Sequence, residues 1–211
     1  MDSIKQALEN WMNDLSNFSF KEYEALPDLD LYMDQVVTFL DKQLGIFQTS
    51  TLDKQITPSM INNYVKGEVL PSPISKKYNK EHLAIIEEIC TLKQVLSIAE
   101  VKQILDSEYA DPLKKGETFN KFNQVNNDKI QQSVEDAFKK LNDIDENDTN
   151  ALTNMALDFA LTANTYIQIS KRILYLIRAY DAYEKAKEEA LRKKEKKEKK
   201  EEIEETESNK E

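Results

Sequence analysis

The sequence predicts an all-α protein in which β-structure is absent or confined to one small wing. Glycine and proline, the residues that interrupt helices, number only three and five among 211 residues, and strong helix formers such as leucine, lysine, glutamate and glutamine are abundant. Apolar residues recur at intervals of three and four along most of the chain, which is the period of a helix with one buried face. A hydrophobic content of 40% suffices for a modest core in one or two domains.

The first segment, residues 1–25, is expected to be an N-terminal amphipathic helix that packs onto the domain that follows. Its apolar residues are spaced by three and four: Ile4, Leu8, Trp11, Met12 and Leu15. Trp11 is expected to lie in the core or to staple the helix to it. The alternative is an exposed anchor for a partner.

A second helix is expected after the break at residues 26–28, with Asp28 or Asp30 as its cap and Leu44 at its end. Its apolar face comprises Leu31, Val36, Val37, Phe39, Leu40 and Leu44. The connection at residues 46–56 is longer than a tight turn and has room for an extra helical turn.

A third helix is predicted over residues 58–66. Thr57 can accept a hydrogen bond from its first turn, and the proline that follows is tolerated because its missing N–H needs no partner there. Ile61 and Val65 then face the core. Gly67 is expected to end the helix in a left-handed turn.

Two prolines, at positions 71 and 73, prevent an immediate restart, and a short basic loop follows them. Asn79 begins the next helix, and the sequence Ser97-Ile-Ala-Glu100 is a capping box that opens another. The order helix, prolyl turn, basic loop, helix, helix is typical of a winged helix-turn-helix that reads DNA.

Four residues of the third helix are expected to face a DNA groove: Ser59, Asn62, Asn63 and Lys66. An asparagine amide can pair with the N6 and N7 edge of adenine, and a lysine can contact phosphate or guanine. Tyr64 could reach a phosphate, or could lie in the core with only its hydroxyl at the surface. Lys76 and Lys77 are the candidates for the wing, unless they only solubilise a turn.

The net charge of −10 opposes DNA binding, but its distribution favours one basic face. Between positions 54 and 80 the only acid is Glu68, and the lysines are Lys54, Lys66, Lys76, Lys77 and Lys80. We therefore expect local binding of moderate affinity that depends steeply on salt. The alternative is that these lysines form an ordinary solvated surface.

One segment resembles the second helix and exit turn of MerR-like DNA-binding domains: residues 61–71, Ile-Asn-Asn-Tyr-Val-Lys-Gly-Glu-Val-Leu-Pro. Two further segments, residues 78–83 and 92–105, resemble the two following helices of that domain. This resemblance implies a MerR-like winged helix-turn-helix domain over residues 26–106.

A closer resemblance is to the bacterial family catalogued as domain of unknown function 1836. It is carried by residues 26–37, Leu-Pro-Asp-Leu-Asp-Leu-Tyr-Met-Asp-Gln-Val-Val, together with Ile-Asn-Asn-Tyr-Val at 61–65 and Lys-Lys-Tyr at 76–78. From about Leu26 to Leu105, about half of the chain is similar to these families.

Two features depart from the MerR-like pattern. Asn62 and Asn63 replace the arginine and tyrosine that are common there, so an amide stands in place of one phosphate clamp. The wing between Pro73 and Lys76 is short and has no arginine. The resemblance therefore implies no deep minor-groove insertion and carries over no base preference.

Residues 107–117 are expected to be a linker to a helical association or sensing region at 118–184. That region should contain a helix at 129–141 and a long helix from Ala151 past Tyr183. The long helix has an apolar seam close to a heptad, formed by Met155, Phe159, Thr162, Tyr166, Ile169, Ile173, Leu176, Ile177 and Tyr180. It should either pack on the 129–141 helix and the N-terminal helix, or pair with another copy.

Residues 185–211 form a charged tail, with a lysine-rich block followed by a glutamate-rich one. A frayed helix end followed by disorder is favoured over an electrostatic arm for DNA or a partner. The reason is that the two blocks neutralise one another.

The sequence lacks the motifs of an enzyme. It has no glycine-rich phosphate loop, no Ser-His-Asp or Cys-His set and no metal-ligand cluster, so no catalytic residue, cofactor or metal is expected. The single cysteine, Cys90, is expected in the core, and His82 lacks partners for a metal or catalytic site. No apolar run has the length of a signal core or a membrane span, so a cytoplasmic protein without a membrane partner is expected.

Together these observations predict a transcriptional regulator, a homodimer that places two copies of the 58–66 helix in successive major grooves of double-stranded DNA. The competing prediction is a non-enzymatic helical scaffold for protein–protein interactions, favoured by the acidic charge and the missing arginines. A further hypothesis is that the apolar seam of the C-terminal helices encloses an unknown small-molecule effector.

Overall fold

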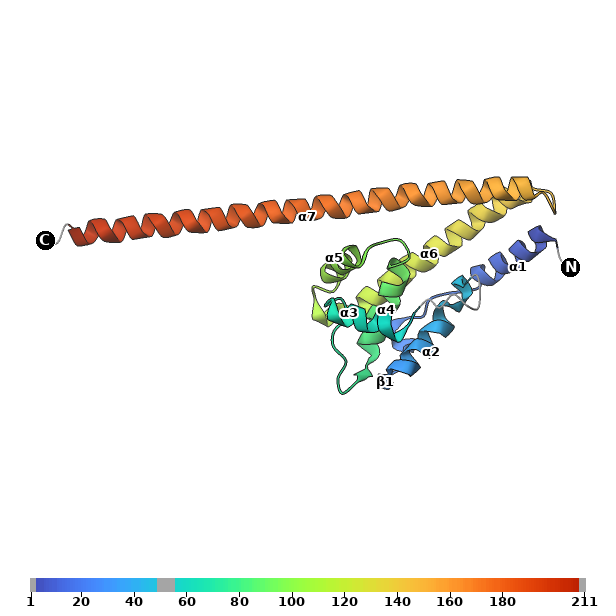
Figure 1. Cartoon of the computed structure of the whole chain (residues 1–211), viewed down its shortest axis with the longest axis horizontal. Helices are drawn as coiled ribbons and strands as arrows, with labels where there is room; N and C mark the ends of the chain where they lie inside the picture. The colour runs from blue at the N-terminus through green and yellow to red at the C-terminus, as the bar shows by residue number, and fades with distance from the viewer. Residues whose placement is uncertain (1–2, 49–55, 209–211) are drawn as a thin grey trace. The chain divides into compact units, whose positions relative to one another are not determined.

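The computed structural model describes residues 3–48 and 56–208 and is helical over most of that length (Figure 1). Within these ranges the α-helices are α1 (Ile4–Ser16), α2 (Met33–Leu44), α3 (Pro58–Lys66), α4 (Lys80–Leu92), α5 (Ile98–Glu108), α6 (Lys115–Asn142) and α7 (Thr149–Ser208). Three short 3₁₀ turns are η1 (Tyr23–Ala25), η2 (Gly45–Phe47) and η3 (Pro112–Lys114). The predicted all-α class is confirmed. The chain divides into two compact units, Met1–Asn164 and Thr165–Glu211.

The β-structure of the described residues is one antiparallel pair, β1 (Leu31–Tyr32) with β2 (Lys77–Tyr78). Because β1 holds the main chain extended up to Tyr32, α2 begins at Met33. Tyr32 is the N-cap residue of α2 and donates its N–H to Gln35 Oε1 at 2.9 Å. The prediction that Asp28 or Asp30 caps this helix is therefore wrong. Asp28 instead pairs with Lys80, at 2.6 Å between Oδ1 and Nζ.

The N-terminal helix is shorter than predicted. It starts at the Ser3 cap and ends at Ser16, and residues 17–22 are not helical. Trp11 is 45% exposed and donates its indole N–H to the Ile46 carbonyl at 3.3 Å. The expectation of a core tryptophan is therefore corrected, because Met12 and Leu15 occupy the buried face of α1.

Side-chain amides of α6 hold the extended segment that follows α1. Asn127 makes two hydrogen bonds to Phe20, accepting from its N–H at 2.8 Å and donating to its carbonyl at 3.3 Å. Asn120 accepts from the Tyr23 N–H at 2.6 Å. Two further contacts are Asn123 Nδ2 to the Lys21 carbonyl at 2.8 Å and Gln131 Nε2 to the Ser16 carbonyl at 2.7 Å. We call these four side chains the amide ladder.

This ladder explains why α6 begins at Lys115, well before the predicted helix at 129–141. Its first turns carry Phe119, which is fully buried beside Leu26 and Ala84. A linker is predicted at residues 107–117, whereas α6 begins within that range, at Lys115, and packs against α4.

The core of the first unit surrounds α4. Leu83, Ile86 and Ile89 are fully buried, and Cys90 is buried as predicted. Burial raises the pKa of the Cys90 thiol to about 12, so the thiol is unreactive near neutral pH.

Two adjacent glutamates of α4 are also buried. Glu87 accepts a hydrogen bond from Asn123 Nδ2 at 3.2 Å, and Glu88 accepts one from the Tyr109 hydroxyl at 2.8 Å. The second oxygen of each carboxyl has no hydrogen-bond partner. Burial raises the pKa of Glu87 to about 7 and that of Glu88 to about 8.

The exit turn of α3 differs from the prediction. Gly67 has φ −81°, and Glu68 is the residue in the left-handed region, with φ 55°. A Cβ on Gly67 would lie 3.2 Å from the Asn63 carbonyl oxygen, so the glycine permits a close approach of the main chain rather than a left-handed angle. The Glu68 carbonyl accepts from Lys102 Nζ at 2.7 Å, which holds the turn.

The first turns of α7 pack through Leu152 and Met155 onto the cluster formed by α1 and α6. The helix then continues to Ser208, through the charged tail, where a frayed helix end followed by disorder is expected from the sequence. Lysine and glutamate have good helix propensity, and i,i+3 pairs such as Glu184 with Lys187 (3.5 Å) support the helix. In the part of the chain that the structure describes, no helix has both the length and the apolar character needed to cross a bilayer.

Removing one rung of the amide ladder should destabilise the first unit. Asn127→Ala leaves the N–H and carbonyl of Phe20 without these partners, which we expect to lower the free energy of unfolding by about 1 to 3 kcal/mol. Urea denaturation followed by circular dichroism measures this, with Gln124→Ala on the exposed face of α6 as the matched control. Equal stability of the two variants would contradict a structural role for the ladder.

The buried glutamates should make stability depend on pH. Because their folded pKa values lie above the ordinary value of 4.5, the folded protein retains protons that the unfolded chain releases. The contribution of these two carboxyls to stability is therefore fully present below about pH 4.5 and is lost as pH rises to about 8, by on the order of 1 to 3 kcal/mol. Urea titrations from pH 5 to 8 should show a flatter profile for Glu87→Gln than for the unaltered protein, whereas Glu117→Gln, at an exposed site, should leave it unchanged.

Candidate nucleic-acid interface

The helix α3 has one buried and one exposed face. Thr57 Oγ1 accepts from the Met60 N–H at 3.3 Å, as the cap predicts. Ile61 is fully buried, and Val65 is partly buried beside it on the inner face. The outer face exposes four of the predicted groove residues, Ser59, Asn62, Asn63 and Lys66. Helical periodicity accounts for this separation.

Tyr64 does not lie on the exposed face. It is 5% exposed, three residues from Ile61 on the buried side of α3, and burial raises its pKa to about 12. Its hydroxyl is buried and has no hydrogen-bond partner. The sequence leaves two positions open for Tyr64, a phosphate contact or a core position with the hydroxyl at the surface. The structure places the side chain in the core, but its hydroxyl does not reach the surface. The expectation of a phosphate contact by Tyr64 is therefore corrected.

The basic loop is a tight hairpin. Ile74 and Lys77 exchange two main-chain hydrogen bonds, at 3.1 and 2.9 Å. The two residues between them, Ser75 and Lys76, both have positive φ, at 51° and 64°, as a two-residue type I′ turn requires. Lys76 is exposed at this turn.

The hairpin is fixed to the rest of the first unit by β2. Tyr32 of β1 pairs with Lys77, and the Lys77 ammonium lies 5.2 Å from the centre of the Tyr32 ring, within the range of a cation–π interaction. Both α3 and β2 pack against α2. The two segments that carry the predicted contacts therefore share one supporting helix.

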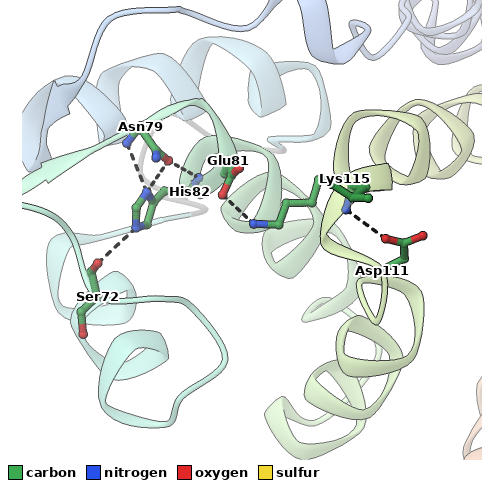
Figure 2. Close-up of polar contacts among 7 residues, drawn as sticks. Ser72, Asn79, Glu81, His82, Asp111 and Lys115 are labelled. Carbon is green, nitrogen blue, oxygen red and sulfur yellow. Dashed lines mark hydrogen bonds and ion pairs between the residues drawn. The ribbon is translucent and has the colours of Figure 1, made fainter.

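His82 anchors the other side of this loop (Figure 2). It is buried, its Nδ1 accepts from the Asn79 N–H at 3.2 Å, and its Nε2 lies 3.3 Å from the Ser72 carbonyl, which it can reach as a donor. The Asn79 side chain in turn accepts from the His82 N–H at 3.1 Å, which completes the cap of α4. The sequence does not predict this role for His82. The one sequence feature that indicates it is the three-residue spacing of Asn79 and His82, which is the spacing of a capping pair.

The basic face is smaller than the sequence count suggests. Lys54 lies outside the described residues. Lys80 is engaged by Asp28 and by the Glu24 carbonyl, at 3.1 Å, and stacks over the Tyr23 ring. Lys66 and Lys76 are exposed, and Lys77 is partly covered by Tyr32.

The described part of the chain has apolar cavities but no cluster of metal-ligating side chains. Among the residues described, no group of three or more histidine, cysteine, aspartate or glutamate side chains is arranged to bind a metal ion. A cavity of about 290 Å³ in the first unit is lined by side chains that include Phe20, Leu44, Cys90 and Asn126. It is mostly apolar, and it lies away from the exposed face of α3.

The model of one protein family, described as a domain of unknown function (DUF1836), matches residues 21–126, which is half of the chain. No curated protein and no solved structure shows significant similarity. The matched segment begins in the stretch held by the amide ladder and includes α2 to α5 and the hairpin. This chain therefore belongs to the DUF1836 family.

Proposed function

We propose that this protein is a transcriptional regulator that binds double-stranded DNA through a MerR-like winged helix-turn-helix. In this proposal α2 is the supporting helix, α3 enters the major groove, and the hairpin at residues 74–77 is the wing. The observation that carries the proposal is that α3 presents four polar side chains on one exposed face while it shares a supporting helix with a lysine-bearing hairpin.

The exposed side chains divide into base-reading and phosphate-binding groups. Asn62 and Asn63 each carry an amide that can pair with the N6 and N7 edge of adenine, and Lys66 can reach guanine or phosphate. Lys76 and Lys77 suit the flanking phosphates, which position the protein without reading sequence. The wing has a fixed turn and no arginine, so it favours phosphate contact over insertion into the minor groove.

The dimeric form of the proposal follows from α7. Two copies of α3 would lie about 34 Å apart in successive major grooves, and α7, with its exposed apolar residues, would join the two copies. The net charge of −10 repels phosphate elsewhere on the surface. Binding should therefore be moderate in affinity and weaken steeply with salt.

Fluorescence anisotropy tests the proposal directly. The purified protein is titrated with DNA from upstream of its own gene and with a scrambled duplex, each over a salt series. We expect tighter binding to the upstream DNA, and a loss of about 1 to 3 kcal/mol for Asn63→Ala with that duplex only. Lys76→Ala should weaken binding to both duplexes and reduce the salt slope by about 1.

Matched controls separate these effects from altered folding or total charge. Asn10→Ala removes an exposed amide from α1, and Lys129→Ala removes an exposed ammonium from α6. Both should bind DNA as the unaltered protein does, and all variants should keep its thermal melting temperature. Absence of binding at low salt to either duplex would count against the proposal.

The second candidate function is a non-enzymatic scaffold for protein–protein interactions. It is favoured by the row of exposed apolar side chains on α7 and by the absence of arginine from residues 26–106. It predicts a stable complex with a partner protein and no retention on DNA, so the anisotropy experiment distinguishes the two functions.

A further inference from the structure

A second cavity of the first unit is lined by side chains of α4, α5 and α6. Its volume is about 180 Å³, and its wall is mostly apolar: Leu92 from α4, Ile104 and Leu105 from α5, and Phe122 and Val125 from α6. An apolar cavity of about 150 Å³ can hold a molecule of the size of benzene. The cavity between these helices therefore has room for a small molecule with a single ring.

The most deeply buried polar residue in the wall of this cavity is Glu88, which is 1% exposed. Its Oε1 accepts a hydrogen bond from the Tyr109 hydroxyl at 2.8 Å, whereas its Oε2 is buried and has no hydrogen-bond partner. A buried acceptor without a partner is unfavourable, so this oxygen gains when a donor reaches it. An apolar cavity with one such polar group in its wall is typical of a site for a small molecule.

The charges around Glu88 favour a cationic donor. Burial raises the pKa of Glu88 to about 8, against the hydrogen bond from Tyr109, which lowers it. The carboxylates of Glu87 on α4 and Glu108 on α5 also raise this pKa. Glu108 lines the cavity too, and the basic residue of the wall, Lys121 on α6, is exposed to solvent. A cation beside Glu88 would therefore relieve both the missing hydrogen bond and the repulsion among the carboxylates.

We propose that this cavity binds a small primary ammonium ion that carries one apolar group. The ammonium donates to Glu88 Oε2, and a hydrogen bond between two charged groups is stronger than one between neutral groups. The apolar group occupies the space among Leu105, Phe122 and Val125. The inference does not rest on the proposed function, because the cavity is formed by α4, α5 and α6 and its ligand is not DNA.

Binding of this ligand should depend on pH through Glu88. The ammonium pairs with the charged carboxylate, so binding displaces the proton that Glu88 retains below about pH 8. The affinity should therefore rise at least about tenfold between pH 6.5 and 8.5, as the carboxyl loses its proton before the ligand arrives.

Methyl NMR titrations of the full chain with three probes test the inference. Benzylammonium, benzyl alcohol and toluene share one ring and differ in the group that would meet Glu88. We expect shifts at the methyl groups of Ile104, Leu105 and Val125, and dissociation constants obtained from these methyls measure binding in the cavity alone. At pH 8.5 benzylammonium should bind at least about tenfold more tightly than the other two probes.

Three variants identify the groups that bind. Glu88→Gln removes the charge but keeps the size of the side chain and an acceptor for Tyr109. It should weaken benzylammonium binding at least about tenfold, abolish the pH dependence and leave toluene binding unchanged. Val125→Trp, at a half-exposed position, should fill the cavity and block all three probes. Glu117→Gln, at an exposed site on α6, is the matched control and should bind as the unaltered chain does.

The unfavourable outcomes are distinct from one another. Equal affinity for the three probes, or unaltered benzylammonium binding by Glu88→Gln, would overturn the assignment of a cationic ligand. Titrations in which no probe shifts the methyls of the wall would overturn the cavity as a binding site. DNA binding is measured separately by anisotropy, so neither result depends on it.

Discussion

The amide ladder of α6 is the interaction on which the arrangement of the first unit depends. An extended segment such as residues 17–22 has main-chain donors and acceptors that no helix or sheet satisfies, and leaving such groups unpaired next to a core is costly. Side chains at positions 120, 123, 127 and 131 recur at helical spacing, so they form one row on α6 that matches the exposed main chain. The segment can thus pass over α6 without secondary structure of its own.

Asn123 connects this row to the centre of the fold. Its Nδ2 donates both to the Lys21 carbonyl and to Glu87 Oε1, so one amide joins the N-terminal segment, α6 and α4. A buried carboxyl is unfavourable without such a partner. The arrangement therefore couples the packing of three segments to the protonation of one side chain.

The helical class, the caps at Thr57, Asn79 and Ser97, and the two faces of α3 could be predicted from the sequence, because each depends on residues within one turn of one another. The start of α6 could not be predicted, since it depends on the contact of Phe119 with Leu26 and on the ladder, and both are long-range. Tyr64 was ambiguous for a related reason. A tyrosine on the border of a helical face is placed by its neighbours in space, which periodicity does not reveal.

The same limit applies to the loop after α3. Its prolines and lysines indicated a turn, but the left-handed angles fell on Glu68, Ser75 and Lys76 rather than on the nearby glycine. A hydrogen bond from Lys102 holds the turn at Glu68, and His82 contacts the Ser72 carbonyl earlier in the loop; both residues come from later helices. The candidate interface is thus shaped partly by residues that carry none of its expected contacts.

The position of Trp11 has a consequence for spectroscopy. It is the single tryptophan of the chain, half exposed and hydrogen-bonded to η2 rather than buried around α4. Its fluorescence therefore reports on the docking of α1 near η2 more directly than on the part of the core around α4. An unfolding transition followed by tryptophan emission would coincide with the loss of helical ellipticity only if the N-terminal helix detaches together with the core, so the two signals form an internal measure of cooperativity in this unit.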